Sequence, residues 1–235
     1  MKMGNKYWAV VPAAGVGRRM GTMLPKQYLK LHGRTVIEHT LSRLSRHPRI
    51  EAVVVAIGAG DDHWRQQQLD ERDKIHVTEG GAERCHSVLN GLARLSDLAD
   101  EHDWVLVHDA ARPCLHPDDI SHMIEVLHDH PVGGLLGVPV ADTVKRSNAE
   151  DEVLETVSRD HLWRALTPQM FRLGQLRRAL QSALEDHFLV TDEASAMEHA
   201  GLKPRMVAGR ADNIKITRPE DLSLAELFLA QQENA

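Results

Sequence analysis

Residues 10–26 read V-V-P-A-A-G-V-G-R-R-M-G-T-M-L-P-K, and the rest of the chain is organised around this stretch. The apolar run Tyr7–Val11 predicts a short buried strand, which Pro12 ends because proline cannot donate to a strand ladder. A loop of small residues follows, and it includes Ala13, Ala14, Gly15 and Gly17. Small side chains let successive backbone N–H groups approach a ligand closely, and such donors form an anion-binding nest. The stretch therefore predicts a buried strand followed by a phosphate-binding loop.

Cationic side chains accompany this loop, namely Arg18, Arg19 and Lys26. Guanidinium and ammonium groups neutralise phosphate charge, so their presence favours a polyphosphate ligand. An ordinary glycine-rich turn with solvated basic residues is the alternative. A Walker loop is excluded because the chain contains no G-x-x-x-x-G-K-[S/T] run. An NAD-binding fold is a minor alternative, since Gly15-x-Gly17 lacks the third glycine and the second predicted strand does not end in an acidic residue.

The composition suits one large α/β domain spanning residues 1–235, because 42% of the 235 residues are hydrophobic. A formal net charge of −6 argues against a general nucleic-acid-binding surface. No apolar run reaches the length of a membrane span, and the first six residues are too polar for a signal peptide. Cys85 and Cys114 provide neither a disulfide framework nor a metal cluster, so we expect a reducing, cytoplasmic setting. The 15 histidines include no H-E-x-x-H motif, and we interpret them as solvated surface residues.

Helical and strand patterns alternate beyond the first loop, which is typical of a mostly parallel sheet with helices on both faces. Continuous apolar runs predict strands at 52–57, 75–78, 104–107 and 132–140. Helical spacing predicts helices at 36–44, 88–95 and 173–184. Capping residues predict two more, one that begins after Asp61-Asp62 and a last one that begins at Pro219. The run T-D-E-A at 191–194 is interpreted as a helix N-cap with acids in the first turn. Residues 205–208 and 213–217 are predicted as closing strands.

Two further runs follow predicted strands, at the edge where open α/β sheets bind ligands. Residues 80–88 read G-G-A-E-R-C-H-S-V and offer free backbone donors and a hydroxyl at a helix start. A helix start with ordinary turn glycines is the alternative. Residues 107–113 read V-H-D-A-A-R-P and deliver Asp109 to the same edge. A carboxylate there suits Mg²⁺ shared with phosphates, and a helix or turn cap is the alternative.

Residues 142–146 and 153–159 surround a polar turn and predict a hairpin that interrupts the alternation. Such a hairpin has too little apolar content to be stable alone, so we expect an arm at about 140–162 that another subunit steadies. A mobile surface hairpin is the alternative. Lys215 lies between Ile214 and Ile216 in the predicted strand 213–217, and a buried ammonium needs an anionic partner such as phosphate.

The first stretch resembles the P-A-A-G-x-G-x-R-M…P-K signature loop of the sugar-phosphate nucleotidyltransferases. With the runs at 80–88 and 107–113, the arm run D-T-V-K-R and the terminal A-D-N-I-K-I-T, nearly the whole chain resembles the 2-C-methyl-D-erythritol 4-phosphate cytidylyltransferases. The resemblance implies a Rossmann-like α/β fold with a projecting β-arm that makes a homodimer. It also implies transfer of CMP from CTP to 2-C-methyl-D-erythritol 4-phosphate, with release of pyrophosphate, in non-mevalonate isoprenoid precursor biosynthesis.

The resemblance further implies roles for the matching residues. Arg19 and Lys26 would be catalytic residues that hold the triphosphate, and Asp109 would hold Mg²⁺. The nucleotide would contact Ala13, Ala14, Gly15, Gly17, Arg18, Gly81, Ala82, Ser87 and Ala110. The acceptor phosphate would contact Arg112, Thr143, Arg159, Thr167 and Lys215, with Arg159 coming from the arm of a second subunit. Many members carry an acidic or polar residue where Ala82 stands, so only a backbone contact is implied there.

Two other functions remain open on the sequence alone. A ribitol 5-phosphate cytidylyltransferase shares the loop, the Gly-Gly element and the arm, and it differs only in the polyol that it accepts. A non-enzymatic nucleotide-binding module would not need catalytic cations, yet the chain retains Arg19, Lys26, Asp109 and Lys215.

Overall fold

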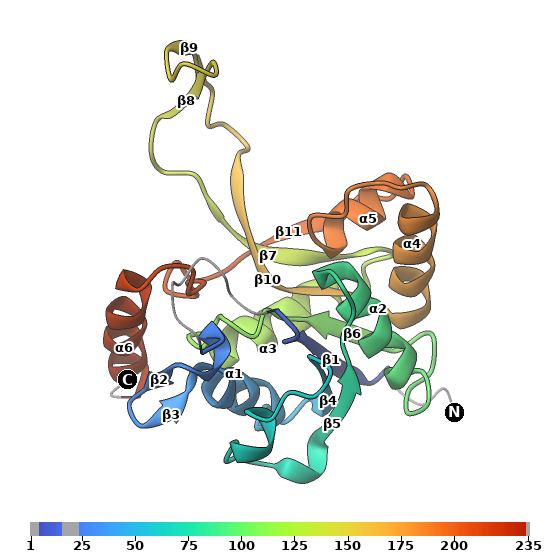
Figure 1. Ribbon diagram of the computed structural model, residues 1–235. Helices are drawn as coiled ribbons and strands as arrows, with labels where there is room; N and C mark the ends of the chain where they lie inside the picture. The colour runs from blue at the N-terminus through green and yellow to red at the C-terminus, as the bar shows by residue number, and fades with distance from the viewer. Residues whose placement is uncertain (1–4, 16–23, 234–235) are drawn as a thin grey trace.

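The computed structural model describes residues 5–15 and 24–233, and a seven-stranded sheet forms its centre (Figure 1). In spatial order the strands are β11 (Arg205–Ala208), β7 (Gly133–Pro139), β10 (Trp163–Arg172), β6 (Trp104–Val107), β1 (Tyr7–Pro12), β4 (Ile50–Ile57) and β5 (Ile75–Glu79). β1 pairs in parallel with β4 and β6, β4 pairs in parallel with β5, and β7 pairs in parallel with β11. β10 runs antiparallel to β6 and β7. The prediction of a mostly parallel sheet is confirmed.

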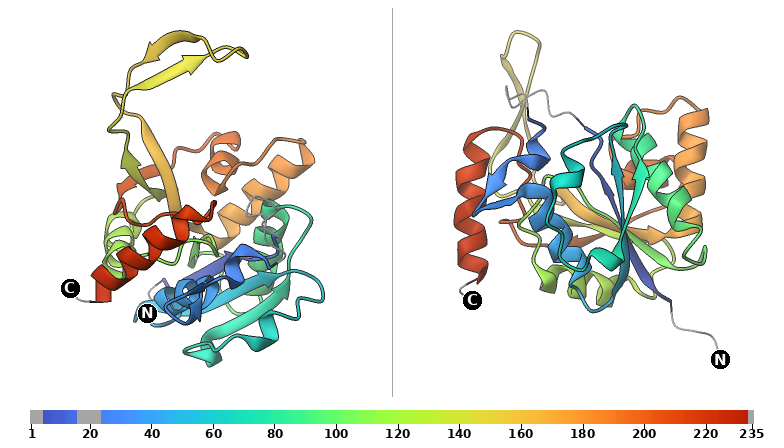
Figure 2. Two further views of the ribbon diagram at one scale, coloured as in Figure 1. Left: turned by 60° about the vertical axis from the view of Figure 1, so that its left-hand side comes forward. Right: turned by 60° about the horizontal axis from the view of Figure 1, so that its bottom comes forward.

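Helices cover both faces of this sheet, which explains why its central strands are apolar on both sides (Figure 2). Along β1, Ala9 and Val11 belong to one core cluster and Val10 to the other, as the two-residue period of a strand requires. The first cluster is closed by α1 (Val36–Ser45) and α3 (Pro117–Leu127). The second cluster is closed by α2 (Arg84–Leu95), α4 (Leu173–Glu185) and α5 (Glu193–His199). This arrangement confirms the predicted Rossmann-like α/β fold.

The first helix begins where its sequence supplies a capping box. The Thr35 hydroxyl accepts from the Glu38 N–H, and the Glu38 carboxylate accepts from the Thr35 N–H at 2.7 Å. A short hairpin precedes it, formed by β2 (Lys30–Leu31) and β3 (Arg34–Thr35). The last helix, α6 (Glu220–Glu233), packs Ala225 and Leu229 into a third cluster beside that hairpin. No helix within the described residues is long and apolar enough to cross a membrane.

The arm leaves the sheet between β7 and β10 and projects from the body of the chain (Figures 1 and 2). Its antiparallel hairpin consists of β8 (Val144–Ser147) and β9 (Val153–Val157). Val153 and Leu154 are each 62% exposed, because no other described part of the chain covers the hairpin. The projecting β-arm is therefore present as predicted.

Two predicted elements differ in the structure. Asp61-Asp62 precede only the 3-10 turn η3 (Trp64–Gln66), and the Asp61 carboxylate accepts from the Tyr28 hydroxyl at 2.7 Å and from the His63 N–H. The chain then reaches β5 through a second such turn, η4 (Arg72–Lys74). Residues 213–217 form no strand either: the Ile216 N–H bonds to the carbonyl after β6 at Ala111, and the Asn213 side chain bonds to β10. Partners on two different elements cannot provide a continuous ladder.

Candidate active site

A pocket of about 200 Å³ lies at the carboxyl edge of the sheet, where β1, β5 and β6 end. It is lined by ten of the predicted site residues: Ala13, Ala14, Gly15, Lys26, Gly81, Ala82, Ser87, Asp109, Ala110 and Lys215. They meet because the carboxyl ends of neighbouring parallel strands lie at one edge. A larger cavity of about 550 Å³, between η2 (Lys26–Tyr28), the start of α1 and residues 63–70, is lined by none of the predicted site residues that the structure describes.

The first loop and the Gly-Gly run form one wall of this pocket. The Gln27 side chain is buried and donates to the carbonyl oxygens of Ala13 at 2.9 Å and Gly15 at 3.1 Å. A Cβ at Gly80 would lie 2.4 Å from the Cβ of Ala14, so only glycine allows the two segments to approach this closely. The predicted loop residues Gly17, Arg18 and Arg19 lie outside the described residues.

Ser87 fixes the turn that leads from β5 into α2. Its hydroxyl oxygen accepts from the Gly81 N–H at 3.0 Å, and the hydroxyl donates to the Glu83 carbonyl at 3.2 Å. Ser87 is 2% exposed, so this turn is well anchored, and Ala82 lies within it. The three residues predicted to contact the base therefore belong to one small structural unit.

Asp109 follows β6 and meets three cationic groups. Its carboxylate lies 2.9 Å from Arg84 Nε, 2.9 Å from Lys215 Nζ and 3.7 Å from Arg112 Nε. Burial alone would raise the pKa of Asp109, but Arg84 and Lys215 outweigh it and hold that pKa well below its usual range. The carboxylate is therefore ionised at neutral pH. It does not cap α3, whose N-cap is His116.

Lys215 has the anionic partner that the sequence required, although that partner is Asp109. Its side chain is 39% exposed, so the ammonium is only partly buried. Lys26 contacts the residue next to Lys215, because its Nζ donates to the carbonyl of Ile216 at 2.8 Å. The irregular segment 213–217 thus brings one cation to Asp109 and receives a hydrogen bond from a second cation.

A second pocket of about 210 Å³ shares Arg84, Asp109 and Lys215 with the first. The predicted acceptor residues Arg112 and Thr167 line it. Arg112 is buried and donates from Nη1 to the Asn213 carbonyl at 2.7 Å, whereas its Nε has no hydrogen-bond partner in the described chain. The three shared residues therefore mark the junction of the two pockets.

His108 is fully buried beneath this junction, so the interpretation of the histidines as surface residues was wrong for it, as it was for His39 and His47. Its Nε2–H donates to the Arg112 carbonyl at 3.0 Å, which leaves Nδ1 to accept from the Thr167 hydroxyl at 2.9 Å. Burial lowers the pKa of His108 to about 4, consistent with this neutral ring. The Thr167 oxygen in turn accepts from the Asp109 N–H at 3.1 Å, so this chain of bonds places the Asp109 backbone.

Arg84, one of the three shared residues, is paired with Glu193, and sequence reasoning assigned neither of them a role. Glu193 is fully buried and accepts from Arg84 Nη1 at 2.6 Å and from Nη2 at 3.1 Å. The signal for Arg84 was present, because it stands inside the quoted run at 80–88. Glu193 was predicted only as an acid of a first helical turn, and no local pattern pairs residues 109 positions apart.

Thr143 and Arg159 are not brought to the site within one chain. Both are exposed on the arm, and neither is among the described residues that line the two pockets. Arg159 donates instead to the Ala141 carbonyl at the base of the same arm. In this structure neither residue therefore contributes to the two pockets.

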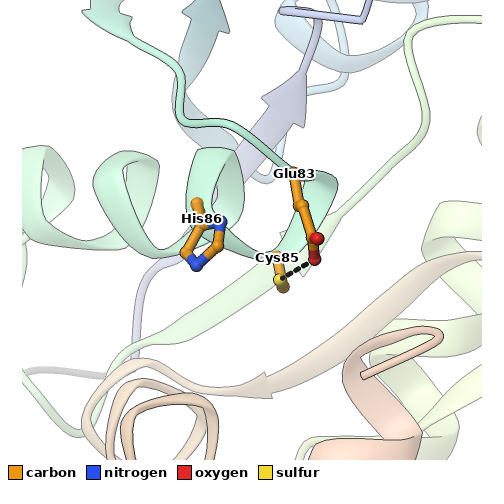
Figure 3. Close-up of side chains that lie close together, drawn as sticks. All are labelled: Glu83, Cys85 and His86. Carbon is orange, nitrogen blue, oxygen red and sulfur yellow. Dashed lines mark hydrogen bonds between the residues drawn. The ribbon is translucent and has the colours of Figure 1, made fainter. Parts of the chain in front are cut away.

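A group of potential metal ligands lies at the start of α2, where one ligand atom each of Glu83, Cys85 and His86 lies within 4.8 Å of the others. Figure 3 shows the Cys85 thiol directed at the Glu83 carboxylate, to which it donates at 3.8 Å. Burial raises the pKa of this thiol, and a thiol with an imidazole suits a softer cation than Mg²⁺. The ionised oxygen ligand that Mg²⁺ prefers is offered by Asp109.

Comparison with known proteins agrees with this geometry. The family model described as 2-C-methyl-D-erythritol 4-phosphate cytidylyltransferase matches residues 7–231. A protein of that name from Hahella chejuensis is 54% identical, with 96% of this chain and 93% of that protein covered. Another from Pseudomonas fluorescens (strain SBW25) is 52% identical, with 96% and 97% covered.

Solved structures are similar over the same length. The crystal structure of a 4-diphosphocytidyl-2C-methyl-D-erythritol synthase has a TM-score of 0.83 at 38% identity, with 96% of this chain and 99% of that chain covered. The Francisella tularensis 2-C-methyl-D-erythritol 4-phosphate cytidylyltransferase has a TM-score of 0.82 at 38% identity, with 95% and 100% covered. The chain therefore belongs to the 2-C-methyl-D-erythritol 4-phosphate cytidylyltransferase family.

Proposed function

We propose that the two joined pockets hold the two substrates of the cytidylyltransferase reaction, CTP in the first and the polyol phosphate in the second. The reaction transfers CMP from CTP to 2-C-methyl-D-erythritol 4-phosphate and releases pyrophosphate, as a step of non-mevalonate isoprenoid precursor biosynthesis. The observation that carries the placement is that Arg84, Asp109 and Lys215 line both pockets. The new bond must form where the substrates meet, and these three residues occupy that junction.

The chemistry needs alignment and charge neutralisation more than proton transfer. An oxygen of the acceptor phosphate attacks the α-phosphorus in line, and the bond to the bridging oxygen of the β-phosphate breaks, so pyrophosphate leaves with the electron pair. The attacking oxygen is already an anion, so no general base is required. We assign Arg19 and Lys26 to the triphosphate, where their charge is most valuable when negative charge builds on the transferred group.

The remaining nucleotide contacts are assigned to the wall formed by the first loop and the Gly-Gly run. The backbone of residues 13–15, with Gly17 and Arg18, would face the phosphates. The turn that contains Gly81, Ala82 and Ser87 would face the cytosine, and Ala110 completes the lining. Support comes from the close approach of Gly80 to Ala14, which puts both segments within reach of one ligand.

The acceptor phosphate is assigned to Arg112, Thr167 and Lys215. Three cationic side chains, those of Arg84, Arg112 and Lys215, line the second pocket with the carboxylates of Asp109 and Asp192, and guanidinium and ammonium groups are the donors that a phosphate binds. The Thr167 hydroxyl donates to His108 and accepts from the Asp109 N–H. We propose that Thr167 thereby keeps the pocket wall and the Asp109 backbone in place beside this phosphate.

The family's nucleotidyl transfer generally uses a divalent cation, and we assign Mg²⁺ to the Asp109 carboxylate. One carboxylate suits Mg²⁺, because substrate phosphates and water usually supply its other ligands. When bound, the ion would neutralise charge on the phosphate oxygens.

We also infer a homodimer of single-domain chains (1–235) in which the arm at about 140–162 reaches the neighbouring copy. The exposed Val153 and Leu154 support this inference, because an isolated hairpin gains little from leaving apolar side chains in water. Thr143 and Arg159 would then complete the acceptor site of the second copy. The two cysteines are free, which supports a reducing compartment such as the cytoplasm.

A pyrophosphate-release assay tests the function, with each of the four NTPs crossed against 2-C-methyl-D-erythritol 4-phosphate and ribitol 5-phosphate. We expect turnover with CTP and the methylerythritol acceptor. A failure of every pairing that contains CTP would contradict the function, and a preference for ribitol 5-phosphate would favour the ribitol alternative. For the placement, Lys215→Ala should raise the acceptor KM more than the CTP KM, while Lys203→Ala, at an exposed site, should change neither.

A further inference from the structure

We infer that Glu193 is a positioning residue for the reaction, because it locks the guanidinium of Arg84 in the orientation that holds Asp109 at the junction of the two pockets. The inference rests on the function proposed above. It assigns a role to a carboxylate that is not among the described residues lining either pocket.

The backbone of Glu193 is fixed from two sides. Glu193 is the first residue of α5, and its neighbour Asp192 caps that helix by accepting from the Ser195 N–H at 2.9 Å. Gln169 of β10, which is 1% exposed, donates to the Asp192 carboxylate at 2.9 Å and accepts from the Ala194 N–H at 2.8 Å. The start of α5 is therefore pinned to the sheet, and the Glu193 carboxylate has little freedom to move.

Arg84 connects this fixed carboxylate to Asp109. Its Nη1 and Nη2 donate to the two carboxylate oxygens of Glu193 at 2.6 and 3.1 Å, and its Nε donates to Asp109 at 2.9 Å. The guanidinium is planar and rigid, so a two-point contact on one edge determines where Nε points. A lysine could not reproduce this fork, because a single ammonium nitrogen cannot span both carboxylates with the same geometry.

The burial of the Glu193 charge explains why its pairing with Arg84 matters. A fully buried carboxylate is costly unless it is paired, and Glu193 is paired with Arg84. Arg84 gives Glu193 one N–H from each terminal nitrogen, and its Nε–H is directed at Asp109. Without Glu193, the guanidinium would be free to turn. Asp109 would then lose the fixed donor that holds its carboxylate at the junction.

An ion pair that merely joins α5 to α2 would look similar in a static structure. The two roles differ in what they predict for kinetics. Loss of a structural ion pair lowers the free energy of unfolding but leaves kcat per folded molecule unchanged. Loss of a positioning residue lowers kcat even when the protein is folded, and it does so only while Arg84 is present.

The experiment measures kcat, the CTP KM and urea unfolding for Glu193→Gln, Arg84→Gln and the double variant. We expect Glu193→Gln to fold and to lower kcat by about 10- to 100-fold, the usual effect of removing a residue that orients a site group, with a much smaller change in the CTP KM. The double variant should fall no further than Arg84→Gln alone, since Glu193 acts through Arg84. Glu198→Gln makes the same charge change at an exposed position of α5 and should keep wild-type kcat.

A Glu193→Gln kcat within about twofold of wild type, or losses that multiply in the double variant, would overturn the inference. If Glu193→Gln does not unfold cooperatively, Glu193→Asp replaces it, because this variant keeps the charge and withdraws the carboxylate by one methylene. It should lower kcat to a similar degree, and an unchanged kcat would again overturn the inference. Wild-type turnover in the same assay separates this result from a failure of the proposed function, which would leave the wild-type protein inactive as well.

Discussion

Lowering the pH from 7.5 to 5 should destabilise the fold through His108, the buried histidine that holds Thr167 and thereby Asp109. Burial lowers the pKa of His108 to about 4 in the folded protein, against an ordinary value of 6.5. The unfolded chain therefore binds more protons than the folded chain between about pH 6.5 and pH 4. The contribution of His108 to stability is fully present above this range and is lost as the pH falls through it.

The size of the effect follows from the difference between the two pKa values. A difference of about 2.5 units corresponds to about 3 kcal/mol when the loss is complete. At pH 5 most unfolded molecules carry a charged His108 and most folded molecules a neutral one, so the loss relative to pH 7.5 is about 2 kcal/mol. Burial also lowers the pKa values of His39 and His47, so they add to the acid destabilisation with the same sign.

Urea unfolding, monitored by circular dichroism at pH 7.5 and pH 5, measures the contribution of His108 to the pH dependence of the free energy of unfolding. His108→Gln removes the titrating ring, so it should be less stable than wild type at pH 7.5 but lose about 2 kcal/mol less on acidification. His122→Gln, at an exposed position of α3, should lose as much as wild type. Equal losses in wild type and His108→Gln would refute the reasoning. His108→Asn offers the same comparison if the glutamine variant does not fold.

Three further predictions concern the reaction. Lys26→Ala should lower kcat by about 100- to 1000-fold while weakening CTP binding much less, and a near-normal kcat with poor CTP affinity would show a ground-state contact only. Asp109→Asn keeps an oxygen but loses the charge that holds a hard cation, so its activity should require more Mg²⁺, and a Mg²⁺ titration that follows wild type would remove Asp109 from the metal site. Mixing inactive Arg159→Ala and Lys26→Ala proteins should restore up to about half of wild-type activity per mixed dimer, because one of its two sites is intact. No recovery, once a label has proved subunit exchange, would contradict the shared site.

The order of the elements and the edge that carries the site could be predicted from the sequence, because both depend on local pattern. The run 104–107 was predicted as a strand and is β6, since a strand buried on both faces reads as a continuous apolar run. Asp109 could be placed beside the first loop for a related reason, because parallel strands bring their carboxyl ends to one edge.

Local pattern was misleading where a segment's partners lie on several elements. Residues 213–217 alternate apolar and polar side chains as a strand does, yet their bonds go to Ala111 and to β10, so no ladder forms. The acids Asp61-Asp62 resemble a helix cap, and Asp61 does accept from the His63 N–H, but only the 3-10 turn η3 follows. In the segment 213–217, contacts with other parts of the chain compete with the local preference.

The sequence by itself determined the alternating fold, the loop chemistry and the family resemblance, since each is written in contiguous runs. Only the tertiary structure decided that Glu193 meets Arg84 across 109 positions and that His108 is neutral and bonded to Thr167. The physical reason is that burial and long-range pairing set the charge state and orientation of a polar group. A buried carboxylate or imidazole is stable only with the partner that packing supplies, and the neighbouring residues in the sequence do not specify that partner.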